Sequence, residues 1–424
     1  MTAPDDTRSA VPSLWRNPAF ARLWFAQVIS NAGTAITGLA LPLTAVLLLN
    51  ATTEQMAVLN IASFAPHIVF GLFAGVWVDR ARRQPLLLGA DLGRALLLVT
   101  IPLAAFFGMV TLPHLWIVAF TVSTLTVFSS LASITLLPAI VPQRQLVEAN
   151  SRLAVTDAIL TITTPTVAGS LIQLVSAPKA ILADAISYLG SALTLRGLRA
   201  NEAIAPRRTG RGVVWREIAE GARELGRTPA LRALTVAVCV GTFGTAMQGT
   251  INLIFVVREL AFPPALLGVI GAFGGGGALL GAAAAGRITR RFGVGPTLIA
   301  GNLLWALGAA VAPFVPRSEV AVLIIGAGSA LASFGASLWG VSQMSLRQAI
   351  TPPGLCARAT AARRLPMFAM QIAGAALGGV LGTAIGLRAT LLLGALGLAV
   401  GGLLLYLSPV RAIHDLTAEM PDGV

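Results

Sequence analysis

Long apolar stretches separated by short charged connections constrain this chain more than any other feature. A helix needs about 20 apolar residues to cross about 30 Å of hydrocarbon. Composition agrees with a membrane location, because apolar residues make up 56% of the chain and the mean hydropathy is +0.81. No run of about ten alternating residues, the pattern of a barrel strand, competes with this interpretation. We therefore expect an all-α membrane protein with twelve transmembrane helices, near residues 23–49, 55–78, 86–108, 112–137, 153–175, 177–197, 231–257, 262–286, 296–315, 319–343, 362–384 and 387–409.

The distribution of cations predicts how these helices are oriented. The first twenty residues hold no apolar core of a cleavable signal peptide, so we expect the first span to direct insertion. With the N-terminus inside, all but four of the 30 lysines and arginines fall on the cytoplasmic side, the exceptions being Lys179, Arg258, Arg317 and Arg388. We expect a multi-pass protein of the bacterial plasma (inner) membrane with both termini in the cytoplasm. The net charge of +13 then faces anionic membrane lipids, and no nucleic acid partner is needed to explain it.

Several classes of chemistry are disfavoured by the residues present. Two cysteines cannot form a disulfide framework, and three scattered histidines have no metal-ligand spacing. The sole lysine, Lys179, follows a proline, so the Gly-Lys of a phosphate-binding loop is missing. We expect no metal, no cofactor and no enzymatic activity.

The chain reads as two similar halves joined by a basic segment. We expect an N-terminal six-helix bundle at 1–198, a cytoplasmic linker with an amphipathic helix at 199–230, a C-terminal six-helix bundle at 231–410 and a cytoplasmic tail at 411–424. The stretch NAGTAITG that begins at Asn31 matches TFGTAMQG beginning at Thr242, and similar pairs recur at nearly the same offset. Duplicated bundles are typical of secondary transporters.

The segment from Gly75 to Arg83 carries a family resemblance. Its pattern Gly75-x-x-x-Asp79-Arg80-x-x-Arg83 resembles the signature between helices 2 and 3 of the major facilitator superfamily. The frame RNPAFARLWFAQVISNAGTAITGLALP, with GADLGRALLL and LPAIVPQRQLVEANSRL, is similar to the branch of macrolide-efflux proteins and the enterobactin exporter. The resemblance implies the major facilitator fold and drug:proton antiport, and we expect a monomer.

In that superfamily the signature is a conformational latch on the cytoplasmic face. The resemblance implies a latch role for Gly75, Asp79, Arg80 and Arg83, and for the second copy at Arg287 and Arg290, where Gly286 replaces the acid. The alternative is a plain positive-inside signal, which needs cations but no acid. Asp91 and Arg94 either join the latch or form a self-contained pair three positions apart.

Two membrane acids are candidates for proton coupling. Asp157 is the favoured candidate, with an ion pair to Arg152 or Arg94 as the alternative, and Asp184 either carries a proton or pairs with Lys179 at the interface. Related exporters often have an acid in span 1 where this chain has Thr34. Pro165 and Gly169 resemble the kink of antiporters in span 5.

Polar side chains in spans 1, 4, 7 and 10, which line the cavity in this superfamily, predict a substrate cavity near midplane between the halves. Interhelical hydrogen bonding is the alternative use for them. Because no cavity arginine is evident, an amphipathic substrate is favoured over sugars or inorganic anions. The expected cavity residues are Gln27, Asn31, Thr34, Ser123, Thr124, Thr245, Gln248, Asn252, Ser337, Trp339 and Gln343.

The sequence therefore predicts a secondary transporter that exports a hydrophobic or amphipathic small molecule, such as a drug, antibiotic, siderophore or lipid, in exchange for protons. An importer of a small metabolite, or a transport-inactive membrane sensor on the same fold, stays open as an alternative.

Overall fold

The apolar stretches form helices in the structure, a computed structural model that describes residues 14–71, 74, 77–78, 81–198, 211–318, 320–351 and 355–414. Within these residues all regular secondary structure is helical, and ten helices are long and apolar enough to cross a membrane. Two further helices occupy predicted spans but are not among the ten. One has 17 residues, Thr53–Val69, and the other, Ala177–Arg196, carries Lys179, Asp184 and Arg196 in 20 residues. The all-helical membrane architecture is thus confirmed.

Six helices of the first half pack on one another. Helix α1 lies against α6 and α7, α4 contacts α5 and α7, and α2 contacts α5. A buried apolar cluster that includes Leu98, Ile101, Leu115 and Ile181 fills the space between them. These helices are α1 (Pro18–Leu43), α2 (Thr53–Val69), α4 (Arg83–Phe106), α5 (Leu112–Ile140), α6 (Leu146–Val175) and α7 (Ala177–Arg196).

The second half repeats this plan with its own core. Helices α10 and α11 pack on α12, while α13 and α14 pack on α9. Its helices are α9 (Pro229–Ile254), α10 (Pro264–Phe292), α11 (Val294–Ala309), α12 (Ala321–Ile350), α13 (Cys356–Ala384) and α14 (Leu387–Tyr406).

Local sequence signals fix several helix ends and reveal the repeat. The Asn17 side chain caps α1 by accepting from the backbone N–H groups of Ala19 and Phe20, and Pro18 occupies the first helical position. The first helix of each half continues into a π-helical turn, Thr44–Leu48 after α1 and Phe255–Glu259 after α9. The two turns are at equivalent places, which supports the internal duplication.

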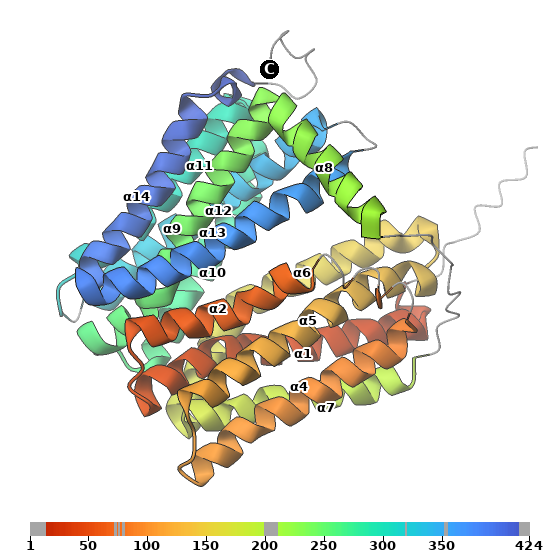
Figure 1. Cartoon of the computed structure of the whole chain (residues 1–424), viewed down its shortest axis with the longest axis vertical. Coiled ribbons are helices and arrows are strands. Elements are labelled where there is room, and N and C mark those ends of the chain that lie inside the picture. Colours follow the sequence, from red (N-terminus) through yellow and green to blue (C-terminus); the bar gives the residue numbers. More distant parts are fainter. Residues whose placement is uncertain are drawn as a thin grey trace, which may run out of the picture.

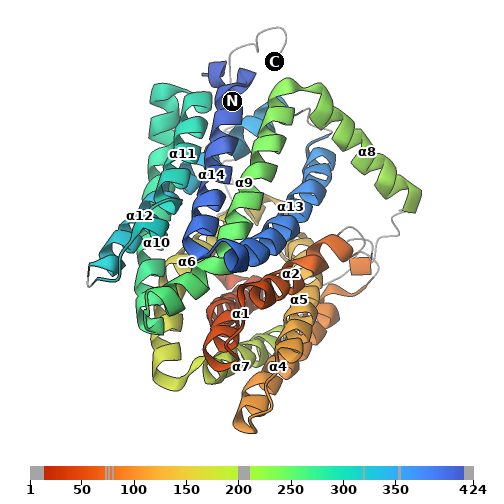
Figure 2. The same ribbon diagram turned by 60° about the vertical axis from the view of Figure 1, so that its left-hand side comes forward.

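The two halves meet at one end and diverge toward the other (Figure 1). Helix α8 (Arg211–Arg227) extends from α9 toward the first half on the diverging side, as Figures 1 and 2 both show. We name the side that carries α8 the open end and the opposite side the closed end. A helix in the linker between the halves agrees with the predicted amphipathic segment, although residues 199–210 lie outside the described residues.

Contacts between α6 and α10 hold the closed end together. A Cβ atom built on Gly268 would lie 2.8 Å from the Pro165 carbonyl oxygen, and one built on Gly275 would lie 2.8 Å from the Ile162 Cα atom. The Thr166 hydroxyl donates to the Gly268 carbonyl at 3.2 Å. Glycines on α10 thus allow the backbones of the two halves to touch.

A second closed-end contact joins α2 to α13. The Thr53 hydroxyl lies 2.8 Å from the Gly379 carbonyl oxygen and 2.6 Å from the Thr383 hydroxyl. Arg258, just after α9, donates to the Val46 carbonyl at 3.3 Å. The predicted kink residues Pro165 and Gly169 belong to this closed end, where Gly169 lies against the Pro264 carbonyl and Gly268.

Candidate functional site

Two adjoining cavities lie inside the first half, and their shared residues Thr34 and Thr126 mark where they meet. The larger cavity, of ≈510 Å³, is lined by α1, α4, α5, α6 and α7 toward the open end. The smaller cavity, of ≈230 Å³, lies between α1, α2, α4 and α5. Together they follow one face of α1 from the open end toward the closed end.

The polar stripe of α1 faces the larger cavity, as its spacing predicts. Gln27 donates to the Ser133 hydroxyl, and the Asn31 amide donates to the Asp157 carboxylate at 2.9 Å. The Thr34 hydroxyl lies 2.8 Å from the Tyr188 hydroxyl. Successive positions on α1 therefore contact α5, α6 and α7 in turn, which gives the cavity polar groups from four helices.

A buried ion pair forms the wall of this cavity on α4. The Arg94 guanidinium contacts the Asp91 carboxylate, and the two side chains are 7% and 3% exposed. The other Asp91 oxygen accepts from the Ser191 hydroxyl at 2.6 Å. This pair is part of a network across helices, because Arg94 also reaches Thr126, Ser129 and the Tyr188 ring, 4.2 Å from the ring centroid.

This pair and Asp157 place charges in the cavity inside the first half, whereas no arginine was evident for the cavity that the sequence predicts between the halves. Arg94, Asp91 and Asp157 all line the cavity. Of the two alternatives for Asp91 and Arg94, the pair three positions apart is found in the structure, and both residues line the cavity from α4. A latch role for them stays a prediction. Since each partner neutralises the other, Asp157 is the lining charge that has no ionic partner among the described residues.

Asp184 lies deeper, between α7 and α1. It is 1% exposed and its carboxylate accepts from the Ser187 hydroxyl at 3.1 Å. A Cβ atom built on Gly33 would lie 2.7 Å from the Ser187 Cβ atom, so only glycine lets α7 bring this acid so close to α1. No ion pair with Lys179 is found in the described part of the chain, in contrast to the interfacial pair considered from the sequence.

Asp157 forms neither of the ion pairs, with Arg152 or with Arg94, that the sequence left open for it. Its partner is Asn31, and Arg152 pairs with Glu148 at 3.3 Å instead. Asp157 is exposed toward the cavity side of α6, whereas Asp184 is enclosed by helices. The two acids therefore occupy different environments.

Predicted cavity residues of the second half lie in other surroundings. The Gln248 amide donates to the Leu391 carbonyl at 2.7 Å, and the Thr245 hydroxyl bonds its own helix. The rings of Trp339 and Trp305 lie tilted to each other with centroids 5.9 Å apart, and the buried Nε2 of Gln343 has no partner among the described residues. Asn252 is exposed, and Ser337 packs against Gly281 of α10. Their roles in a cavity between the halves stay predictions.

The two predicted cavity residues of span 4 have different surroundings. Ser123 lines the smaller cavity and donates to the Ser63 carbonyl at 2.6 Å. Thr124 bonds the Phe120 carbonyl of its own helix at 2.8 Å.

Of the predicted latch residues, Gly75, Asp79 and Arg80 lie outside the described residues. Arg83 begins α4, while Arg287 and Arg290 are exposed near the end of α10. The latch assignment is therefore untested by the described residues.

Several residues of the hydrogen-bond network around Asp91 and Arg94 were not predicted from the sequence. Tyr188 and Ser191 continue the stripe of Asp184 at i+4 and i+7 on α7, a periodic polar pattern that pointed to them. Thr126, Ser129 and Ser133 form a similar stripe on α5. Within the described residues no group of three or more His, Cys, Asp or Glu is arranged to hold a metal ion.

A family comparison matches nearly the whole chain, and individual relatives match parts of it. Residues 9–422 match the family described as transmembrane secretion effector. An uncharacterized MFS-type transporter of Bacillus subtilis, YfiS, is 28% identical over 319 residues, covering 73% of each chain. Macrolide efflux protein A of Streptococcus pyogenes is 29% identical over 183 residues, which span 42% of this chain and 44% of that protein.

The fold also matches solved transporters. A bacterial homologue of the human lysosomal transporter Spinster, solved in an inward-facing and unoccupied conformation, superposes with a TM-score of 0.72 at 14% identity and covers 97% of this chain and 100% of that one. The chain belongs to the transmembrane secretion effector family of the major facilitator superfamily.

Proposed function

We propose that this chain is a proton-coupled secondary transporter that exports an amphipathic small molecule, with twelve spans in two six-helix bundles at 1–198 and 231–410. The local similarity to macrolide efflux protein A supports export. The proposed topology places α8 and both termini in the cytoplasm, so the open end faces inward. Its place is the bacterial inner membrane, it acts as a monomer, and it catalyses no chemical reaction.

Alternating access follows from the two ends of the molecule. Contacts between α6 and α10 and between α2 and α13 close the outer side, and the halves diverge on the α8 side. Rocking one half against the other would open these contacts and bring the diverging ends together. The glycines at the closed end suit this role, because they let backbones touch without interlocking side chains.

The substrate class follows from the lining of the larger cavity. Hydroxyl and amide groups from α1 and α5 face apolar residues such as Leu23, Leu87 and Ile134. Asp157 adds a negative charge whose partner is the neutral Asn31. A cavity with these features favours an amphipathic compound that bears a positive charge or several hydrogen-bond donors.

The observation that carries the coupling proposal is the position of Asp184. It is buried beside Gly33, one residue before Thr34, and Thr34 is bonded to Tyr188, which in turn lies beside Arg94. A buried carboxylate without a cation in contact is costly while charged, so protonation relieves the cost. The proposed coupling residue is therefore Asp184, in place of Asp157, which the sequence favours.

Transport by everted membrane vesicles tests the proposal. Substrates are a macrolide and lipophilic dyes of positive, zero and negative charge, and the driving force is an imposed proton gradient. We expect wild type to accumulate cationic dyes. We expect Asp184→Asn to lose gradient-driven accumulation by at least about tenfold while it still exchanges internal for external dye, since the carboxylate is needed only for proton movement.

Two further variants separate the roles. Asp157→Asn is expected to lose its preference for cationic over neutral dyes and to keep gradient coupling. Glu148→Gln, an exposed acid on the same half, serves as the matched control and should behave as wild type. Full gradient-driven accumulation by Asp184→Asn would refute the coupling role, and accumulation driven only in right-side-out vesicles would indicate import instead.

A further inference from the structure

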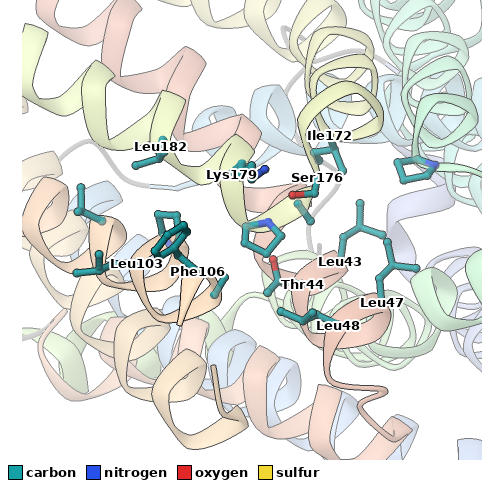
Figure 3. Close-up of a pocket in the computed structure, with 16 residues that line it drawn as sticks. Leu43, Thr44, Leu47, Leu48, Leu103, Phe106, Ile172, Ser176, Lys179 and Leu182 are labelled. Atoms are coloured by element: carbon teal, nitrogen blue, oxygen red, sulfur yellow. The ribbon is translucent and has the colours of Figure 1, made fainter. Parts of the chain in front are cut away.

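A third cavity lies at the closed end and is not part of the proposed transport path. It has a volume of ≈630 Å³ and is formed by the ends of α1, α4, α6 and α7 with the first residue of α10 (Figure 3). Leucines from three helices and Phe106 dominate its wall, and none of its lining residues is acidic. Such a wall suits a hydrocarbon chain.

One cation lies at this cavity, and it is the sole lysine of the chain. Figure 3 shows Lys179 and Ser176 on the same side of the cavity. Lys179 is exposed and forms no ion pair or hydrogen bond within the described residues. Its ammonium group is therefore available to a ligand.

The other cations predicted on this side are already bonded to the protein. Arg388 contacts the Glu259 carboxylate and donates to the Pro313 carbonyl at 2.8 Å. Arg317 donates to the Glu259 carbonyl, and Arg258 donates to the Val46 carbonyl. Lys179 has no such bond within the described residues. Its position therefore cannot be explained by hydrogen bonds to nearby backbone carbonyls.

The start of α7 adds further donors beside the lysine. Ser176 occupies the N-cap position but makes no side-chain capping bond, so its hydroxyl is left to an external partner. Lys179 is the third helical residue, and its backbone N–H has no acceptor within the helix. An anion at this place would meet an ammonium group, a hydroxyl, an N–H group and the positive end of the helix dipole.

We propose that this cavity binds one anionic phospholipid from the membrane leaflet at the closed end. The phosphate accepts from Lys179 and the start of α7, and one acyl chain enters the apolar cavity between α1 and α4. A free phosphate would gain nothing from the leucines, and a zwitterionic lipid would gain less from an unpaired ammonium group. The inference requires that the start of α7 lies at the membrane surface, but it does not require proton coupling or export.

Lipid retention by the purified full-length protein tests the proposal. Protein is equilibrated in detergent micelles that hold equal amounts of phosphatidylglycerol and phosphatidylcholine, re-purified, and its retained lipids are quantified by mass spectrometry. We expect selective retention of phosphatidylglycerol by wild type and by Lys179→Arg. Lys179→Gln should retain roughly fivefold less, as expected for the loss of one surface cation.

Two controls separate this site from general effects. Arg317→Gln removes a cation on the same side that already has a protein partner, and it should retain phosphatidylglycerol as wild type does. Leu182→Trp fills the cavity while keeping the lysine, and it should lose the lipid. Wild-type retention by Lys179→Gln, equal loss in Arg317→Gln, or equal retention of phosphatidylcholine by wild type would each overturn the proposal, and a transport defect alone would not.

Discussion

The Thr53 hydroxyl of α2 lies 2.6 Å from the Thr383 hydroxyl of α13, so a hydrogen bond joins the two halves at the closed end. Rocking of the halves requires that this contact breaks in every cycle. We predict that a disulfide between Thr53→Cys and Thr383→Cys, in a chain whose Cys239 and Cys356 are replaced by serine, stops transport. The measurement is accumulation in vesicles before and after oxidation.

Reduction of that disulfide should restore transport, which separates a reversible lock from damage. The single variants Thr53→Cys and Thr383→Cys, oxidised in the same way, are the controls and should keep transporting. Undiminished transport by the fully cross-linked double variant would show that the closed end does not open.

A second prediction concerns the α6–α10 contact. Valine at Gly268 places a side chain where a Cβ atom alone would be 2.8 Å from the Pro165 carbonyl and 3.0 Å from the Thr166 Cα atom. The closed end cannot then form as seen here, so the population shifts toward the conformation in which it is open. We expect the Thr53→Cys side chain to react faster with a membrane-impermeant maleimide in Gly268→Val than in the parent.

Gly276 offers the matched control on the same helix, because a Cβ atom there meets nothing within 4 Å. Gly276→Val should leave the reaction rate of Thr53→Cys unchanged. Equal rates in Gly268→Val and the parent would argue against steric control of the closed end.

A third prediction concerns the buried pair of Asp91 and Arg94. Removing one partner leaves an uncompensated charge in a low-dielectric interior, so Arg94→Gln should lower the free energy of unfolding by about 3–5 kcal/mol. The double variant Asp91→Asn with Arg94→Gln should be destabilised less than the two single effects combined, since no lone charge remains. Denaturant unfolding of the protein in detergent micelles measures both.

The pair of Arg152 and Glu148, with side chains 49% and 48% exposed, is the solvent-exposed control for the Asp91 and Arg94 variants. Arg152→Gln should change the free energy of unfolding by about 0–1 kcal/mol, as for other solvent-exposed pairs. Similar losses in Arg94→Gln and Arg152→Gln would mean that the environment of Arg94 is wetter than its 7% exposure indicates.

The all-helical membrane architecture could be predicted from the sequence because the length of an apolar stretch is a local property. The all-helical membrane fold and a helix in the linker followed from length, hydropathy and a loose apolar stripe. The surroundings of Gln27 and Gln248 could not be predicted from such local properties. Both lie on polar stripes of equivalent helices, yet one lines a cavity and the other donates to the Leu391 carbonyl between α9 and α14.

Which helix lies opposite a given face depends on tertiary packing. The surroundings of the membrane acids could therefore not be predicted from the sequence. For Asp184 the sequence left open a proton site or an ion pair with Lys179, five positions away. In the structure the absence of a side chain at Gly33 lets α7 bury the acid against α1. For Arg94 the sequence left open a latch role or a pair with Asp91 on the same helix, but it could not show that these residues line a cavity. Periodic polar positions on α7 and α5 were the sequence signals that pointed to the network.

The last prediction concerns how α8 is held. The Arg358 guanidinium contacts the Glu220 carboxylate at 2.6 Å, but both side chains are about one-third exposed, so this pair alone contributes little. The close approach of backbones contributes more, because a Cβ atom built on Gly221 would lie 2.9 Å from the backbone nitrogen of Ala359. Valine at Gly221 should therefore detach α8 from α13, whereas Gly226→Val, where a Cβ atom meets nothing within 4 Å, should not. Hydrogen exchange of residues 211–227 measures the difference: we expect faster exchange across this segment in Gly221→Val than in Gly226→Val, and equal protection in the two variants would show that α8 is held by contacts other than this backbone approach.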